Sequence, residues 1–454
     1  MSSLSEKLVH EYVASFSQDL AEKYAIDYSK YSTVNIKRGL RNADSTGVIA
    51  GVTKVGSVMG YMVMDGAPIA MPGKLYYRGY DVEEIVDSHA KSGKFGYEEV
   101  AYLLLMGELP TPEELEKFDA ILSQARYLPD GFTEDMIIKA PSRNIMNKLA
   151  RSVLALYSYD DNPDDTSIEN ILRQCIELIG RFPVIVANAY AVKRHYYDGK
   201  SLYIHVPREN LSVSENFLRI VRQDKSYTEE EARLLDLMLI LHAEHGAGNN
   251  SAFSCRVLSS TGTDTYSAIA AAVGSLKGPL HGGAAKAAKD MFLDIKANVS
   301  DPTDEGALKD YLVKMLDGEA GDRSGKIYGL GHAVYTISDP RAVLLKKYAR
   351  TMAEEKGRGE DFRILESIER LGIPLIMERK HLTIPICANV DMYSGFVYSM
   401  LGIPDDLLTP LFATARISGW CAHRIEEILT GGRIIRPAYK AGAASRPYTE
   451  IEQR

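Results

Sequence analysis

Four short segments bring together residue types that could carry out chemistry. Three are glycine-rich and contain histidine, and one is acidic: HAEHGAGNNS (242–251), GPLHGGA (278–284), GLGHAVYTISDPRA (329–342) and NVDMYSG (389–395). Neutral imidazoles and a carboxylate base suit proton abstraction beside a carbonyl, and Arg341 could hold an anion. The four segments therefore predict a carbon–carbon condensation on an anionic substrate.

His281 lies between Pro279 and the pair Gly282-Gly283, directly before a predicted helix. The positive end of a helix dipole disfavours the imidazolium form, so we expect a neutral ring that can donate one hydrogen bond to a developing enolate. A turn histidine exposed to solvent would be an equally good interpretation by itself. The two glycines favour a functional role, because they let the backbone approach a ligand closely.

His332 and Asp391 depend on their sequence context for a functional interpretation. GLGH is a common pattern, but GLGH followed by VYTISDPR is specific. Asp391 comes after an apolar run that begins at Ile384, where an aspartate is most often a helix N-cap. A desolvated carboxylate at this place would act as a base only with partners that hold the enolate.

His242 and His245 form an HxxH pair on one predicted helix face. A zinc site of the HExxH type needs a different spacing, with Glu244 at another position and a third ligand, so we predict no metal. His242 is expected to be structural. His245 lies nearer to the glycines that follow and is expected to face a ligand.

Arginine is the best holder of a dicarboxylate, because its planar guanidinium group binds carboxylates with two hydrogen bonds. Arg341, Arg416 and Arg436 lie in or near the four segments, or in the sequence after the last predicted helix. Arg424 is expected only as a surface partner of Glu427, three residues further on.

Helical periodicity dominates the elements that must position these residues, so we predict a mainly α fold. Thr111 and Thr228 begin helices with capping-box patterns, and the segment after Thr228 is apolar on nearly every side, as in a buried helix. Further helices are predicted at 265–276, 284–295 and 412–429, the last ending at Gly431-Gly432. Short β-structure is plausible only at 47–81.

The bulk properties limit the class of protein. A chain of 454 residues predicts two domains, and a net charge of −8 argues against a nucleic-acid binder. Four scattered cysteines favour neither disulfides nor zinc and suit a reducing compartment: Cys175, Cys255, Cys387 and Cys421. The first thirty residues lack the apolar core of a secretory signal, and no long apolar run predicts a membrane span, so we expect a cytoplasmic protein.

The four segments resemble those of the citrate synthase family in order and spacing. LYYRGYDVEEI, FATARISGW, RIIRP and the final RPYTEIEQR extend the resemblance over most of the chain. It implies a two-domain, multi-helix homodimer with short β-structure near the N-terminus. Residues 1–281 and 396–454 would form the large helical domain and the dimer interface, and residues 282–395 a small domain that closes over the active site.

The resemblance also implies roles for individual residues. His281 is similar to the histidine that hydrogen-bonds the acetyl-CoA enolate, Asp391 to the base, and His332 to the group that polarises the oxaloacetate carbonyl. The residues similar to oxaloacetate ligands are His245, His332, Arg341, Arg416 and Arg436, the last reaching in from the partner subunit. The implied reaction forms citryl-CoA and hydrolyses it to citrate and CoA, with no tightly bound cofactor.

One position departs from the family pattern. Many relatives carry Arg or Lys between GHAVY and DPR to meet a coenzyme A phosphate, whereas this chain has Thr336. Contacts to coenzyme A must then come from elsewhere, with Arg323, Lys326, Gly329 and Gly331 as candidates.

Three other functions remain open at this point. A 2-methylcitrate synthase would use the same residues with propionyl-CoA, and one extra methylene gives only ~1–3 kcal/mol of discrimination. A catalytically silent helical scaffold or regulatory paralogue would be expected to lack a polar catalytic residue, and none is missing. A metal-dependent hydrolase would use His242 and His245.

Overall fold

The computed structural model describes the chain except for residues 1–22, 43–45, 65–66 and 431. Two compact units are distinguished: a main unit, Ala50–Ile435, and a terminal unit formed by Met1–Ile49 and Arg436–Arg454. The described part of the terminal unit contains short 3-10 turns, η1 (Tyr28–Tyr31), η2 (Arg38–Leu40) and η6 (Ile451–Gln453), and an antiparallel bridge between Arg41 and Gly47. The main unit contains the four segments.

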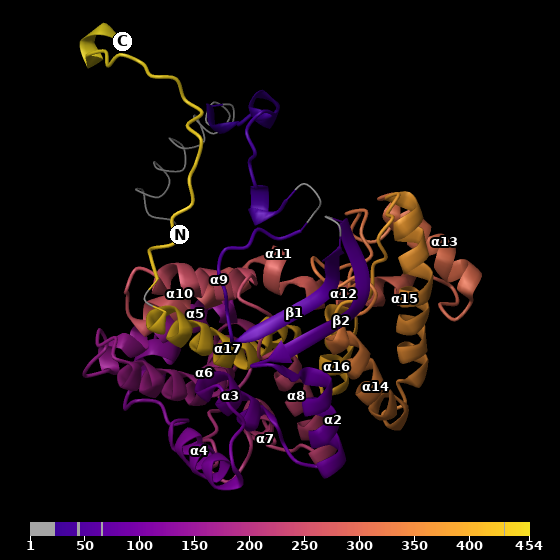
Figure 1. The fold of residues 1–454 in the computed structure, drawn as a ribbon. Helices are drawn as coiled ribbons and strands as arrows, with labels where there is room; N and C mark the ends of the chain where they lie inside the picture. The colour runs from indigo at the N-terminus through magenta and orange to yellow at the C-terminus, as the bar shows by residue number, and fades with distance from the viewer. Residues whose placement is uncertain (1–22, 43–45, 65–66, 431) are drawn as a thin grey trace. The chain divides into compact units, whose positions relative to one another are not determined.

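The main unit is built mostly from α-helices (Figure 1), which confirms the predicted fold class. Its helices are α2 (Val82–Ser92), α3 (Tyr97–Met106), α4 (Pro112–Gln124), α5 (Ile145–Leu156), α6 (Ile168–Asp198), α7 (Val213–Val221), α8 (Glu229–His242), α9 (Asn250–Ser259), α10 (Thr265–Lys277), α11 (Pro279–Gly282), α12 (Ala284–Asn298), α13 (Glu305–Leu316), α14 (Pro340–Glu355), α15 (Gly359–Arg379), α16 (Asp391–Met400) and α17 (Leu408–Leu429). Shorter turns are η3 (Thr133–Ile138), η4 (Tyr157–Tyr159) and η5 (Asp405–Leu407).

A small antiparallel sheet lies near the start of the main unit, as the pattern at 47–81 predicted. Its strands are β1 (Gly56–Met64), β2 (Ala67–Tyr77) and β3 (Tyr80–Asp81), in the order β1-β2-β3. Gly56 pairs with Tyr77 at one end of the β1–β2 hairpin. The register shifts between Met59 and Tyr61, so the hairpin contains an irregularity in its middle.

The core of the main unit surrounds α17, which packs against α3, α6, α8, α9 and α10. Trp420 at its centre has no exposed surface. We expected no membrane span. Among the described residues α6 is long and apolar enough by length and composition, but 83% of its most apolar window is buried inside the protein, so these side chains belong to the core.

Two predicted helix starts are confirmed with their capping boxes. The Thr111 hydroxyl accepts a hydrogen bond from the Glu114 backbone, and Thr228 does the same for Glu231. α8 is buried along nearly its whole length, as predicted from its continuous apolar sequence. It ends at His242, and Gly246 follows with a φ of 80°, which lets the chain turn sharply after the second histidine.

One local prediction needs correction. Arg424 is not a surface residue: it is completely buried and donates to the Thr263 carbonyl, while Glu427 pairs with Arg256. Helical spacing places Arg424 and Glu427 near each other, but α17 is surrounded by other helices, so its polar groups find partners there. The helix ends at Leu429 with Thr430 as C-cap, and the predicted stop at Gly431 falls outside the described residues.

Thr228→Ala should lower the free energy of unfolding by about 1 kcal/mol, because it removes the hydroxyl that accepts from the first turn of α8. The change would be measured as a shift of the urea midpoint. Thr228→Ser keeps the hydroxyl and serves as the control. Equal midpoints for the Ala variant and the wild type would contradict the importance of this cap.

Candidate active site

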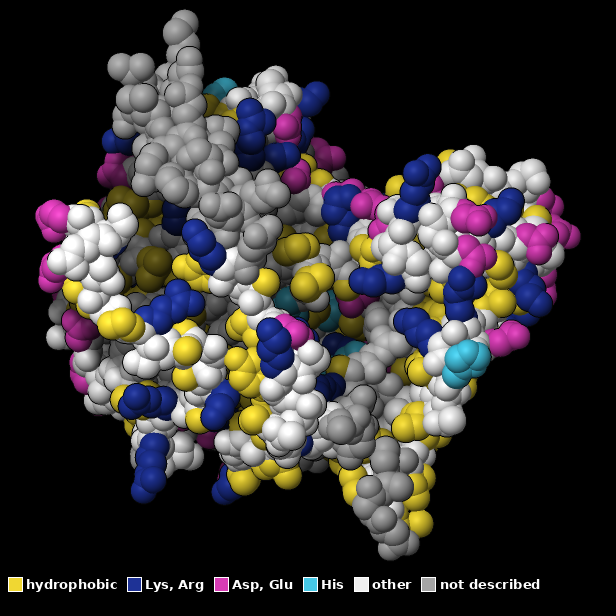
Figure 2. Space-filling model, turned by 90° about the horizontal axis from the view of Figure 1, so that it is seen from above, with side chains coloured by type: hydrophobic (Ala, Val, Ile, Leu, Met, Phe, Trp, Pro, Cys, Tyr) yellow, Lys and Arg dark blue, Asp and Glu magenta, His cyan; other side chains and the backbone are white. Residues whose placement is uncertain are grey.

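The first and third histidine-containing segments meet in space. The rings of His245 and His332 lie 5.2 Å apart between centroids, almost perpendicular to each other. The Tyr335 ring stacks on His332 at 4.6 Å and meets the edge of His245 at 5.6 Å. Figure 2 shows histidine side chains at the bottom of a hollow in this face of the protein, with Lys and Arg side chains around it.

The turn that follows His332 determines which ring nitrogen carries the proton. The backbone N–H groups of Val334 and Tyr335 both donate to His332 Nδ1, at 3.0 and 3.1 Å. Nδ1 is therefore an acceptor, so a neutral ring carries its proton on Nε2. His332 can thus donate a hydrogen bond from Nε2, as polarisation of a carbonyl oxygen requires.

Backbone pairing joins the His332 loop to the segment that leads to Asp391. Leu330 forms an antiparallel bridge with Ala388, Gly331 N donates to the Cys387 carbonyl at 2.8 Å, and Asn389 N donates to the Gly329 carbonyl at 2.9 Å. A β-carbon on Gly329 would lie 2.7 Å from the Met392 backbone. Gly329 therefore has a structural reason, which is the close approach of these segments, whereas Gly331 takes a φ of 92° and a β-carbon there would meet no atom within 4 Å.

Asp391 begins α16 but does not cap it, because no side-chain capping bond is formed there and Val390 is the N-cap residue. Burial raises the pKa of its carboxyl to about 6, against the opposing effect of the Arg341 and Arg416 guanidinium groups. The carboxyl is therefore ionised near neutral pH but is more basic than an ordinary aspartate. This is the property that a proton-abstracting base needs.

The two buried arginines of the site differ in their partners. Arg341 binds Asp339 through Nε at 3.0 Å and Nη2 at 2.7 Å. Arg416 donates from Nε to the His242 carbonyl at 2.6 Å, but its two Nη groups are buried without a hydrogen-bond partner among the residues that the structure describes. Two adjacent donors of this kind fit a carboxylate.

His281 lies in the one-turn helix α11 rather than in an open turn. Burial, assisted by Arg416, lowers the pKa of its ring to about 4. The neutral form is thus as expected, but its main cause is burial and not the helix dipole. The Ser251 hydroxyl donates to Asn249 Oδ1 at 2.8 Å, so His281 Nε2, 3.1 Å from the same oxygen, is the donor of that contact. The direction of the single Ser251 proton thus selects the tautomer of His281.

His242 lies at the back of the site. Its ring packs on Phe412 with centroids 4.5 Å apart, and both ring nitrogens are buried without a hydrogen-bond partner within the described part of the chain. Burial, with Arg341 and Arg416 nearby, holds the pKa well below its ordinary value, and the same causes act on His245. Both rings are therefore neutral. In the described ranges no group of three or more His, Cys, Asp or Glu side chains could hold a metal ion.

The remaining predicted residues are not among the side chains described above. Arg436 belongs to the terminal unit, where it is exposed. Arg323 and Lys326 are exposed in the loop after α13. The sequence analysis gave no role to Tyr335, Asp339 or Ser251, although all three lie inside the four segments. The DPR pattern could have indicated Asp339, because it places an N-cap aspartate two residues before an arginine.

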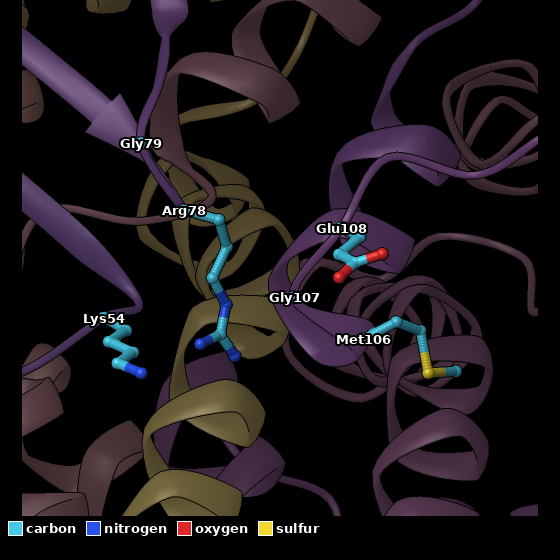
Figure 3. A pocket seen from close by; sticks show the side chains of 6 residues that line it. All are labelled: Lys54, Arg78, Gly79, Met106, Gly107 and Glu108. Atoms are coloured by element: carbon cyan, nitrogen blue, oxygen red, sulfur yellow. The ribbon is translucent and has the colours of Figure 1, made fainter.

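A separate pocket of about 440 Å³ is lined by other residues, Lys54, Arg78, Gly79, Met106, Gly107 and Glu108 (Figure 3). The Arg78 guanidinium donates twice to the Leu104 carbonyl, at 3.1 and 2.6 Å, so it closes the C-terminal end of α3. None of the four segments contributes to the lining.

The groups described here, a half-buried base, neutral histidines and buried guanidinium groups, are those that enolate chemistry on an anion requires. Residues 44–438 match the family described as "Citrate synthase, C-terminal domain". The chain belongs to the citrate synthase family. It is an enzyme of the transferase type, in a family that condenses an acyl-CoA with oxaloacetate.

Individual relatives agree with this assignment. A citrate synthase of Deinococcus radiodurans is 37% identical over 386 residues, which cover 84% of this chain and 93% of that protein. A 2-methylcitrate synthase of Shewanella oneidensis is 32% identical over 381 residues, 84% of this chain and 92% of the relative. The ternary complex of carboxymethyl coenzyme A and oxaloacetate with citrate synthase from Thermoplasma acidophilum has a TM-score of 0.73 and 29% identity, and the match covers 92% of this chain and 99% of that one.

The raised pKa of Asp391 predicts a pH-dependent effect on stability. Because the folded-state pKa of about 6 exceeds the ordinary 3.8, the stability from this group is present at low pH and is lost as the pH rises through 6. Asp391→Asn should therefore gain about 2 kcal/mol of unfolding free energy over the wild type between about pH 4.5 and about pH 7.5. Urea denaturation at several pH values measures this, with Asp310→Asn as an exposed control. A pH-independent difference would show that burial does not raise the pKa.

Proposed function

We propose that this chain condenses acetyl-CoA with oxaloacetate and hydrolyses the resulting citryl-CoA to citrate and CoA. The observation that carries the proposal is the half-buried Asp391 carboxyl, whose pKa of about 6 makes it a competent base under the influence of the Arg341 and Arg416 guanidinium groups. Acetyl-CoA is a substrate here, and the mechanism needs no tightly bound cofactor and no metal.

In the first step Asp391 takes a proton from the acetyl methyl group while His281 donates a hydrogen bond to the enolate oxygen. Burial keeps the His281 ring neutral at the working pH, so the enolate meets a hydrogen-bond donor and not a strong acid. For this step the Ser251 proton would turn from Asn249 Oδ1, to which the hydroxyl donates in this structure, to His281 Nε2, so that the ring proton lies on Nδ1 and serves as the donor.

In the second step the enolate carbon attacks the ketone carbon of oxaloacetate. His332 donates from Nε2 to the ketone oxygen, in the tautomer that the Val334 and Tyr335 amides favour. Arg416 supplies two unpaired Nη donors for a carboxylate, and Arg341 and His245 complete this set of ligands. Water then cleaves the thioester of citryl-CoA.

We also propose the domain and subunit arrangement that the resemblance implies. Residues 282–395 would form the smaller domain, which agrees with the mutual packing of α12 with α16, α13 with α15, and α14 with α15 and α16. The active form would be a homodimer in which Arg436 of each chain completes the partner's site. We expect the enzyme to act in the cytoplasm, since its four cysteines are all free.

Coenzyme A would lie along the loop that precedes His332, with Arg323 and Lys326 exposed for its phosphates. Thr336 takes no part in this contact, because its side chain is buried and bonded to the β1–β2 hairpin.

Thiol release with oxaloacetate and either acetyl-CoA or propionyl-CoA ranks the two acyl substrates directly. A larger kcat/KM with acetyl-CoA supports the proposal, and a larger value with propionyl-CoA would make the chain a 2-methylcitrate synthase, the alternative that the Shewanella relative favours. Absence of thiol release with both would indicate a silent scaffold. Loss of activity with a chelator would indicate a metal-dependent hydrolase.

Asp391→Ala should lower turnover ~10²–10⁴-fold, because a positioned base contributes about that much. Thiol release at saturating substrates measures the loss, and Asp310→Ala, a change of an exposed aspartate on α13, controls for general effects. Turnover within a few-fold of the wild type would contradict the role of Asp391 as the base.

Arg436→Ala should raise the KM for oxaloacetate, and mixing it with Asp391→Ala protein should restore part of the activity. In a mixed dimer one site keeps both residues intact if Arg436 acts across the subunits. Activity would be measured in purified mixed dimers. If verified mixed dimers stay as inactive as the parents, Arg436 does not act across subunits.

A further inference from the structure

The β1–β2 hairpin touches the His332 loop where its own pairing is interrupted. Met59 pairs with Lys74 and Tyr61 with Ala70, so one residue of β1, Gly60, stands opposite three residues of β2. Such a bulge leaves backbone groups without partners in the ladder. These groups are the ones that meet the loop.

Three hydrogen bonds cross from the bulge to the loop. The Thr336 hydroxyl lies within bonding range of the Gly60 carbonyl and of the Met71 carbonyl, the latter at 3.3 Å. The Gly73 amide donates to the Ser338 hydroxyl at 3.1 Å. Loop and hairpin are more than 250 residues apart in the sequence, so this contact is a tertiary connection made by a few named groups.

The two glycines of the bulge let the loop approach closely. A β-carbon on Gly60 would lie 2.5 Å from the Val334 carbonyl oxygen and 2.6 Å from the Tyr335 α-carbon. A β-carbon on Gly73 would overlap the Ser338 carbonyl oxygen and lie 2.7 Å from the Tyr335 ring. The obstructing atoms are mainly backbone, which cannot move aside as a flexible side chain would.

The hairpin also contacts the segment that contains His245. The Tyr77 hydroxyl donates to the Ile240 carbonyl at 2.8 Å, at the end of α8. A β-carbon on Gly246 would lie 3.1 Å from a methyl group of Val58. The sheet is therefore in contact with both of the loops that carry His245 and His332.

We propose that the β1–β2 bulge is the element that positions His332 for the reaction, with Thr336 as its principal contact. This inference rests on the proposed function. The Val334 and Tyr335 amides hold His332 Nδ1, and the Tyr335 ring stacks on His332. Thr336 directly follows these two residues, so its hydroxyl fixes the loop at this point. Thr336 is a positioning residue, since it acts through this turn and touches the hairpin.

Loss of the contact should affect binding more than turnover. If the loop is in its binding conformation only part of the time, the apparent dissociation constant of its ligand equals the intrinsic constant divided by that fraction of time, so it rises. Bound oxaloacetate would reorder the loop, so the rate at saturation would change little. A residue with a merely structural role would instead lower the fraction of active enzyme, which reduces kcat and leaves KM unchanged.

The test compares Thr336→Val, which keeps the shape and removes the hydroxyl, with Thr336→Ser, which restores it. We expect Thr336→Val to raise the KM for oxaloacetate about 10-fold, with kcat within about twofold of the wild type, and Thr336→Ser to behave like the wild type. Thr351→Val, an exposed change on α14, is the control. An unchanged KM, or a fall in kcat alone, would overturn the proposal.

A second measurement does not depend on catalysis. Amide hydrogen exchange of residues 332–338 without substrates should be faster in Thr336→Val and in Gly73→Ala than in the wild type, whereas Gly51→Ala, which meets no atom within 4 Å, should leave it unchanged. Unchanged exchange in Thr336→Val would overturn the positioning role. If the wild type released no thiol while exchange responded as expected, the proposed function would fail and the structural connection would stand.

Discussion

Two buried guanidinium groups beside three neutral histidines are the constraint on which the rest of the site depends. A buried charge without compensation is costly, so each group needs an anion or strong acceptors. Arg341 has this in Asp339, which is itself completely buried and accepts two hydrogen bonds from the guanidinium. Among the described residues Arg416 donates a hydrogen bond only to the His242 carbonyl, from Nε, and burial lowers its pKa to about 10 although Glu244 nearby opposes this. Its two Nη groups are therefore left to bind an anionic ligand.

Asp339 also connects the parts of the chain that carry the catalytic groups. Its carboxylate caps α14 through the Arg341 amide and accepts a hydrogen bond from the Val390 amide at 3.2 Å. Val390 directly precedes Asp391, so one carboxylate fixes the cation, the start of α14 and the approach to the base. The positive charge of Arg341 in turn limits the pKa rise that burial imposes on Asp391. The position of Asp391 and the pKa of its carboxyl thus both depend on the Arg341–Asp339 pair.

Elements whose signals lie in neighbouring residues were predicted correctly from the sequence. The predictions failed where tertiary packing determines the environment of a side chain. Capping boxes at Thr111 and Thr228 need only neighbouring residues, and both helices begin there. The neutral state of His281 was expected from a helix dipole, whereas burial is the larger cause, and burial cannot be read from a turn motif. Arg424 was assigned to the surface because helical spacing shows a neighbour at Glu427 but not the helices that surround α17.

The role of the hairpin was also not predicted from the sequence. The segment 47–81 predicted short β-structure, but nothing local indicates that Gly60 and Gly73 face the His332 loop. That requires knowledge of a register shift and of a contact between distant parts of the chain. The candidate chemical residues were found because they stand in short motifs, and the groups that hold them were missed because they act from elsewhere.

The charge of Arg416 is balanced from outside the histidine cluster. Glu244 is completely buried, and although burial opposes its ionisation, His423 and Arg416 hold the pKa of its carboxyl below the ordinary value. Arg256 donates to His423 Nδ1 at 2.9 Å, so the ring presents its Nε2 proton to Glu244 Oε1 at 3.0 Å. His423 stands seven residues after Arg416, on the same side of α17. A β-carbon on Gly419, between them on this helix, would lie 2.5 Å from Glu244 Oε2, so the carboxylate can approach the helix only because this residue is glycine. The helix that carries the buried cation thereby also fixes the anion that keeps it charged.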